Sequence, residues 1–450
     1  MREKHTVQRS IFDYYVEHEI GQELKCMSDW LDAHPEILDL VAKDVLRGDV
    51  NATGRKGLTA ESILRCALLK QYRQLSYDEL AFCLLDSLSC RTFARLPGGW
   101  VPKKSVLQAA ISAITDVTWE QIHLSILHSA KGCKVEPGEM LRIDSTVTET
   151  PIHPPSDSQL LWDSVRVMVR LLESANQLCP PGIELEWSNH QRRAKRRARQ
   201  IGYTRGKDKK ARLYRDLIQV ARNSLGYLEQ AQLALSVAGV LDESLYLRWQ
   251  AEVGHYTPLI LQVIDQTQRR VFKGEKVPAG EKVFSLFEQH TDIIIKGSRD
   301  IQYGHKINLS SGRSGLILDV VIESGNPADS ERLIPMLERH IEHYGKAPRQ
   351  MATDGGYAST DNLDKAKAHG VQDVAFHKKR GLKIEDMAKS PWVYRKLRNF
   401  RAGIEAGISC LKRAWGLARC TWKGIEHFKA YVWSLVVAHN LALLGRLSVP

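Results

Sequence analysis

Apolar residues recur at helical spacing over most of the first 135 residues. The segment 58–71 places four of them on one helical face: Ile63, Leu64, Ala67 and Leu68. Ser76 and Glu79 form a capping-box pattern, in which a hydroxyl and a carboxylate bind free amides at a helix start. Another amphipathic stretch runs from Lys103 to His128. These patterns predict a helical N-terminal domain over 1–135, with a loop around 51–57.

Strand-like patterns are confined to two parts of the chain. Residues 140–147 are typical of a buried strand that ends on an acid. After a helical region, the segments 304–309 and 315–322 alternate around a polar turn and predict a hairpin. Further strands are predicted at 292–295, 350–354 and 371–376, and helices at 330–344, 359–369, 392–415 and 428–447.

The order of these elements predicts the fold. With 156–290 set aside, the chain reads strand, hairpin, helix, strand, helix, strand, helix, which is a mixed sheet covered by helices. This is the order of a ribonuclease-H-like core. We therefore expect an α/β protein with a ribonuclease-H-like catalytic core at 136–155 and 291–450. A mainly helical insertion at 156–290 interrupts it after the first strand, and the all-helical domain at 1–135 precedes it.

Composition alters this picture at one place. The chain of 450 residues has a net charge of +12. Residues 191–215 alone hold twelve Lys/Arg and one acid, so the rest of the chain is almost neutral. So dense a basic run suits a polyanion, most simply nucleic acid. The alternative is a solvated basic helix without a specific partner. Likewise, the short N-terminal helices suit either a helix-turn-helix DNA-binding domain or an ordinary helical bundle.

Several classes of protein are disfavoured. No run of 18 apolar residues predicts a membrane span, and the polar N-terminus lacks the apolar core of a signal peptide, so we expect a cytoplasmic protein. The eight cysteines include no Cys-x-x-Cys pair, which disfavours a cysteine-rich zinc module. There is no Walker-type phosphate loop and no Gly-x-Ser-x-Gly, so neither a nucleotide cofactor nor a serine hydrolase is expected.

Three carboxylates stand out by position. Asp144 lies in or near the end of the first predicted strand, Asp354 ends a later strand before Gly-Gly, and Glu405 lies on the predicted helix 392–415. Acids at strand ends meet at one edge of a sheet and repel one another unless a cation is present. Hard oxygen ligands suit Mg²⁺ or Mn²⁺, and two such ions assist a phosphodiester displacement. Taken singly, each acid could instead be a turn or surface residue.

The helix around Glu405 adds a second signal. Arg401, Glu405 and Lys412 share one helical face. An acid flanked by bases can hold a metal ion while the bases contact phosphates. The alternative is an ordinary ion pair between Arg401 and Glu405 within the helix.

The chain resembles bacterial insertion-sequence transposases of the DDE class, near the ISNCY-like group. The resemblance covers roughly residues 140–430, and segment 58–96 is similar to the helical N-terminal part of such enzymes. It rests on several strings of the sequence: IDSTVTETPIH at 143–153, LWDSV at 161–165, GHK at 304–306, LILD at 316–319, GNPAD at 325–329, ATDGGY at 352–357 and RNFRAGIE at 398–405, continued by GLARCTWKG at 416–424.

The resemblance implies a DDE triad of Asp144, Asp354 and Glu405, which are both catalytic and metal-binding. The family pattern Tyr-x2-Arg-x3-Glu-x6-Lys is met except at its first position, which holds Arg398. We expect DNA contacts from this face, from residues beside the strands and from the basic run: Arg398, Arg401, Lys412, His305, Lys306, Arg192, Arg193, Lys195, Arg196, Arg197 and Arg199. For His305, a structural role inside the fold is the alternative.

The implied function is that of a DNA transposase. It would cleave the ends of its element with Mg²⁺, or with Mn²⁺ as a substitute, and join the 3′-hydroxyls to target DNA by transesterification. The expected partner is double-stranded DNA, bound by a homodimer or larger assembly in the nucleoid, with no membrane. Two alternatives stay open: a ribonuclease-H-like nuclease that cuts without joining, and a domesticated DNA-binding protein without catalysis.

Overall fold

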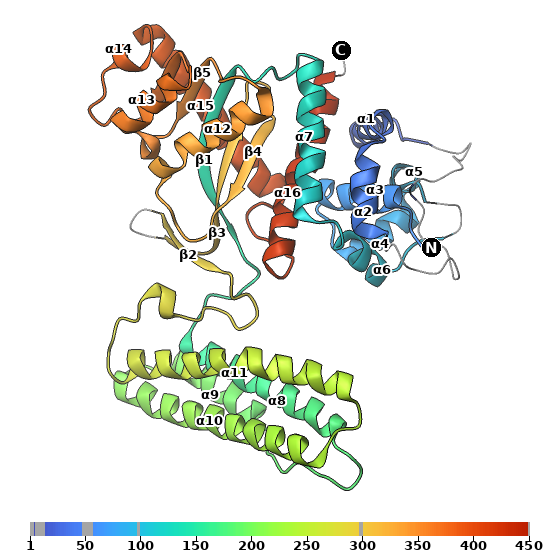
Figure 1. Ribbon diagram of the computed structural model, residues 1–450, viewed down its shortest axis with the longest axis vertical. Coiled ribbons are helices and arrows are strands. Elements are labelled where there is room, and N and C mark those ends of the chain that lie inside the picture. Colours follow the sequence, from blue (N-terminus) through green and yellow to red (C-terminus); the bar gives the residue numbers. More distant parts are fainter. Residues whose placement is uncertain (1–3, 5–13, 47–56, 97–99, 297–299, 449–450) are drawn as a thin grey trace. The chain divides into compact units, whose positions relative to one another are not determined.

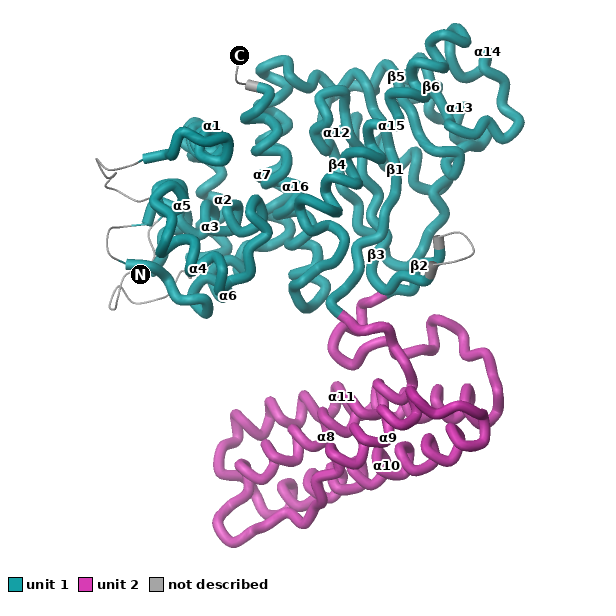
Figure 2. Tube along the Cα trace, turned by 180° about the vertical axis from the view of Figure 1, so that it is seen from behind, with its two compact units in different colours: residues 1–151, 292–450 teal, residues 152–291 magenta. Residues whose placement is uncertain are grey.

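The computed structural model describes residue 4 and residues 14–46, 57–96, 100–296 and 300–448. Most of the predicted loop at 51–57 lies outside these residues. The chain forms two compact units, residues 1–151 with 292–450, and residues 152–291 (Figure 2). Each unit is described by itself.

Within the described residues, seven helices open the first unit. The predicted capping box is confirmed, since Ser76 and Glu79 bind each other's backbone amides. The amphipathic stretch over 103–128 forms two helices, and the hydroxyl of Thr115 caps the second. The helices are α1 (Glu19–Ala33), α2 (Ile37–Val45), α3 (Ala60–Tyr72), α4 (Tyr77–Asp86), α5 (Leu88–Ala94), α6 (Lys104–Ile111) and α7 (Asp116–Gly132).

A mixed sheet of six strands follows (Figure 1). Strand β3 pairs with β1 along one edge. Its other edge pairs with β2 at the start of β3 and with β4 near the end of β3, all antiparallel. On the far side of β1, strands β5 and β6 are parallel to it. The bounds are β1 (Met140–Glu149), β2 (Asp292–Lys296), β3 (Asp300–Ser311), β4 (Ile317–Ile322), β5 (Gln350–Thr353) and β6 (Asp373–Phe376).

The helices between and after these strands complete the core. They are α12 (Leu333–Tyr344), α13 (Thr360–Ala368), α14 (Ile384–Met387), α15 (Pro391–Ala414) and α16 (Ile425–Ser448), with short 3₁₀ turns at Asp329–Glu331 and Gly355–Tyr357. The predicted order of strands and helices is confirmed, including the β3–β4 hairpin. This mixed α/β arrangement is consistent with a ribonuclease-H-like domain.

Helix α16 joins the N-terminal helices to the sheet. It packs against α1, α3, α7 and β4, and its side chains belong to one continuous apolar core with all of them. Asn440 on this helix bonds the backbone of Ile317 in β4. By length and composition, the segment Ile425–Leu447 could cross a membrane, but 72% of its apolar window is buried inside the protein, as expected for a core helix.

The second unit is helical, with an apolar core of its own. The predicted helical character of 156–290 is confirmed. Its helices are α8 (Asp157–Leu178), α9 (Gln191–Tyr203), α10 (Lys207–Ala238) and α11 (Glu243–Val271), and a 3₁₀ turn follows at Ala279–Glu281. The basic run therefore lies on α9 and the start of α10.

Candidate active site

Two of the three predicted acids lie side by side at one edge of the sheet. Strands β1 and β5 are parallel, and Ile143 pairs with Thr353. Asp144 and Asp354 are the next residues on the two strands, so the parallel register brings them to neighbouring positions. Asp354 leaves the sheet at this point and begins the 3₁₀ turn Gly355–Tyr357.

Helix α15 brings the third acid to the same place. The hydroxyl of Ser390 caps its start, and the helix packs against β1, β5 and β6. Its contact with β1 is close at Gly403, where a Cβ would lie 1.8 Å from Nη1 of Arg142. That guanidinium is fixed, because it donates to the Phe400 carbonyl and to the Ser311 hydroxyl. A glycine at 403 thus permits the approach that positions Glu405.

The three acids converge on the guanidinium of Arg401. Its Nη1 lies 3.6 Å from Oδ2 of Asp144 and 3.7 Å from Oδ1 of Asp354. Its Nη2 donates to Oε1 of Glu405 at 2.5 Å. Arg401 is only 7% exposed, whereas the Glu405 side chain is 56% exposed. The predicted Arg401–Glu405 pair therefore forms, but it is part of a larger cluster that includes both strand-end acids.

The chemistry of this cluster fits a divalent cation. Three carboxylates from three elements share one buried positive charge, and carboxylate oxygens are the ligands that Mg²⁺ and Mn²⁺ prefer. Among the described residues, no three His, Cys, Asp or Glu side chains are close enough together to hold an ion as they lie. The guanidinium of Arg401 contacts all three carboxylates in the place where a shared cation would be needed.

Asp329 is a further acid beside the cluster. Its Oδ1 accepts a hydrogen bond from the Ser145 hydroxyl at 3.0 Å and lies 2.6 Å from Nζ of Lys306. A Cβ on Gly356 would come within 2.8 Å of its Oδ2. Asp329 therefore touches both the residue after Asp144 and the turn after Asp354. We did not single it out from the sequence, although it closes the GNPAD string at 325–329.

Tyr357 is a buried tyrosine whose pKa is affected by the negative charge of this region. It is buried, and its hydroxyl lies 3.3 Å from Oδ1 of Asn308. Burial raises the pKa of Tyr357, and the nearby carboxylates of Asp329, Asp144 and Asp354 raise it further. The phenol therefore stays neutral beside the acids.

The predicted DNA contacts near this site differ in exposure. Arg398 is exposed on α15, and Lys412 is half-buried, with a pKa lowered by burial. Lys306 is buried and donates to the Pro327 carbonyl as well as pairing with Asp329. His305 is 3% exposed, and its Nδ1 lies 3.1 Å from Oδ2 of Asp292. This burial and contact favour the structural role for this histidine.

The six basic residues predicted on α9 belong to the second unit. Most of them are exposed, while Arg197 is half-buried. Arg193 and Arg197 share one carboxylate, that of Asp216. The others are Arg192, Lys195, Arg196 and Arg199.

Among known proteins, no curated protein and no solved structure matches the chain. Residues 263–441 match the model of a family described as Transposase DDE domain. The matched stretch contains Asp354, Arg401 and Glu405 and begins after Asp144. The similarity to the transposase DDE domain family therefore covers residues 263–441 and leaves the first 262 residues unmatched.

Proposed function

We propose that the protein is a DNA transposase that cleaves the ends of its mobile element and joins the 3′-hydroxyls to target DNA. The observation that carries the proposal is the convergence of Asp144, Asp354 and Glu405 on Arg401 at one edge of the sheet. The match of residues 263–441 to a transposase DDE domain supports it. The ISNCY-like group is the insertion-sequence group that its sequence strings favour.

Asp144, Asp354 and Glu405 would hold the metal ions, with Mg²⁺ as the proposed species and Mn²⁺ as its substitute. When bound, such ions supply positive charge to the attacking and leaving oxygens of a phosphodiester displacement. The residues of the chain itself have three tasks. The register of β1 and β5 fixes two carboxylates, and α15 supplies the third. The Lys306–Asp329 pair supports β1 at Ser145, next to Asp144, and the turn that follows Asp354.

Arg401 has a double role in this proposal. In the structure its single positive charge pairs with all three carboxylates. Once another cation holds them, its guanidinium is free to contact a DNA phosphate, as guanidinium groups do in many DNA-binding proteins. Arg398 lies three residues before Arg401 and Lys412 eleven residues after it, which places both on the same side of α15 as Arg401, so they would extend this phosphate contact along the helix.

The proposed partner is double-stranded DNA, both element ends and target, in the nucleoid of the cytoplasm. Because two element ends are joined, we propose a homodimer or larger assembly on DNA.

A supercoiled-plasmid assay tests the function. The purified full chain is incubated in Mg²⁺ with a plasmid and a linear fragment that carries the DNA flanking the gene. Fragments joined to the plasmid are the expected product. Nicked plasmid without joined product would instead indicate a ribonuclease-H-like nuclease. DNA binding without cleavage would indicate a silent DNA-binding protein.

A further inference from the structure

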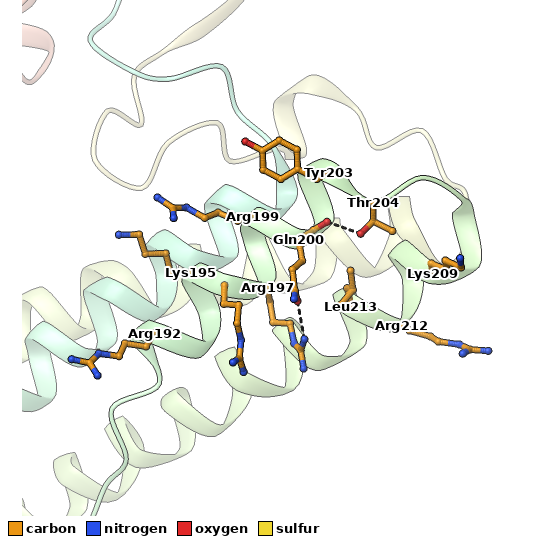
Figure 3. Close-up of a pocket in the computed structure, with 11 residues that line it drawn as sticks. Arg192, Lys195, Arg197, Arg199, Gln200, Tyr203, Thr204, Lys209, Arg212 and Leu213 are labelled. Atoms are coloured by element: carbon orange, nitrogen blue, oxygen red, sulfur yellow. Dashed lines mark hydrogen bonds between the residues drawn. The ribbon is translucent and has the colours of Figure 1, made fainter.

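An open groove of about 880 Å³ lies on the second unit, between α9 and the first turns of α10 (Figure 3). Its lining includes no acidic residue. Seven of its eleven lining residues are cations: Arg192, Lys195, Arg196, Arg197, Arg199, Lys209 and Arg212. The remaining lining is polar or aromatic apart from Leu213.

The sequence of α9 explains why these cations face outward. Ala194 and Ile201 are buried, and Ala198 packs against the same apolar core. Their spacing of four and three residues forms a single narrow apolar stripe. Six of the ten other residues of the helix are basic and none is acidic, so folding the second unit concentrates positive charge on the part of α9 that faces away from the core.

Few of these charges are neutralised within the protein. Asp216 pairs with Arg193 and Arg197, and Lys195 lies over the ring of Trp162 at 5.7 Å. Within the described ranges, Arg192, Arg196 and Arg199 form no ion pair. Keeping like charges this close together costs free energy, which an anionic ligand would recover.

We infer that this groove binds the phosphodiester backbone of DNA, on a unit that contains none of the three triad acids. The inference rests on the proposed function for the choice of DNA over other polyanions. A groove lined by seven cations and no acid suits an anion rather than an apolar small molecule. Its row of cations suits a repeating anion, because each neutralised phosphate releases bound counterions.

Tyr203 lies at the end of α9 beside these cations and is 88% exposed (Figure 3). An exposed ring next to phosphate-binding cations can stack on an unpaired base, whereas in a duplex the bases are already stacked. The backbone in the groove could therefore come from duplex or from single-stranded DNA, and Tyr203 distinguishes the two.

The test measures the affinity of the full chain for a fluorescent duplex and a single strand of equal length, over a range of salt concentrations. EDTA is present so that no cleavage occurs. The groove variant replaces Arg192, Arg196, Arg199 and Arg212 with Gln, which keeps helix propensity. The matched control replaces four exposed cations of the same unit outside the groove: Arg170, Arg222, Arg248 and Lys276.

For the groove variant, we expect the slope of log Kd against log salt to fall by roughly 3, because each lost phosphate contact removes about 0.7 to 0.9. For the control variant, the same slope should fall by less than about 1. Equal slopes for the groove variant and the wild type would overturn the inference, as would equal losses in both variants. Tighter binding of an RNA of the same sequence than of either DNA would also overturn it. Circular dichroism of each variant excludes misfolding as the cause of a loss.

Tyr203→Ala and Tyr203→Phe identify the source of the backbone. If a single strand occupies the groove, Tyr203→Ala should weaken its binding about five-fold or more, and Tyr203→Phe should restore it. If a duplex occupies it, both variants should bind like the wild type while the groove variant still loses affinity. Strand transfer by the wild type together with unchanged binding by the groove variant would reject the groove alone and leave the proposed function standing. Weaker DNA binding by the groove variant, together with no strand transfer by the wild type, would support the groove and reject the proposed function.

Discussion

Nη1 of Arg401 lies 3.6 Å from Oδ2 of Asp144, although one residue is on α15 and the other on the first strand of the sheet. The same guanidinium contacts Asp354 and Glu405. The three acids were predicted to bind a metal cation, and in the structure they lie around a cation of the protein itself, the guanidinium of Arg401. Metal ions and Arg401 should therefore compete for the same carboxylates.

Substitution of Arg401 by Gln tests this competition. Removing the guanidinium frees three carboxylates, so Mn²⁺ should bind about ten-fold more tightly, which corresponds to about 1.4 kcal/mol. Electron paramagnetic resonance of free Mn²⁺ measures this without reliance on turnover. Strand transfer should nevertheless fall, because the phosphate contact is lost.

The matched control is Arg398→Gln, since Arg398 is an exposed cation on the same helix. Its affinity for Mn²⁺ should equal that of the wild type. Weaker Mn²⁺ binding by Arg401→Gln than by this control would show that Arg401 does not compete with the metal.

The ion pair between buried Lys306 and half-buried Asp329 should support the site structurally. Asp329→Ala leaves the ammonium of Lys306 buried without its carboxylate, and the free energy of unfolding should fall by about 3 kcal/mol. Adding Lys306→Met should recover part of this loss, because no charge is then left unpaired. Urea unfolding of the wild type and the three variants forms the double-mutant cycle.

A surface pair provides the comparison for that cycle. Lys346 lies 3.9 Å from Glu139, and both side chains are exposed, so Lys346→Met should change the free energy of unfolding by less than about 1 kcal/mol. Strictly additive losses for Lys306→Met and Asp329→Ala would mean that the two residues are not coupled.

A pH dependence of stability should arise from His123. This side chain is fully buried on α7, its Nε2 lies 2.9 Å from the Ile317 carbonyl, and burial lowers its pKa from 6.5 to about 4. Between these values the unfolded chain binds a proton that the folded state does not. The contribution of His123 is therefore complete above pH 6.5 and is lost as pH falls towards 4, by about 3 kcal/mol.

His123→Gln keeps an amide donor for the Ile317 carbonyl but cannot titrate. Denaturant unfolding between pH 4 and 7 should therefore show a smaller loss of stability for His123→Gln than for the wild type. His340 and His439 are also buried with pKa values lowered to about 4, so part of the loss should persist in the variant. Identical pH profiles would contradict the assignment to His123.

The sequence was informative about the strand order and the acids because these depend on local patterns. Asp144 and Asp354 could be expected to lie close together because each directly follows the residues over which β1 and β5 pair, and parallel strands bring such residues to neighbouring positions. Glu405 followed from helical spacing and family resemblance. Spacing places residues on a face of a helix, but it does not show which neighbours that face meets. The contact of Arg401 with all three acids therefore could not be predicted.

Other features depend on contacts between distant segments. Asp329 follows no strand directly, and only the fold shows that it touches Ser145 and Lys306. The close approach at Gly403 depends on where the side chain of Arg142 points. The basic groove was visible in part as a charge run, but Lys209 and Arg212 of α10 line the same groove as the cations of α9 only because the two helices pack together.

The most direct test of the proposed transposase is strand transfer in Mg²⁺ by the wild type and by Asp354→Asn, using DNA that carries the element ends. Asn keeps the size of the side chain but removes the negative charge that would hold a metal ion. Joined product from the wild type alone, with nearly equal DNA binding by both proteins, is the expected result. Full strand transfer by Asp354→Asn would contradict the assignment of the active site.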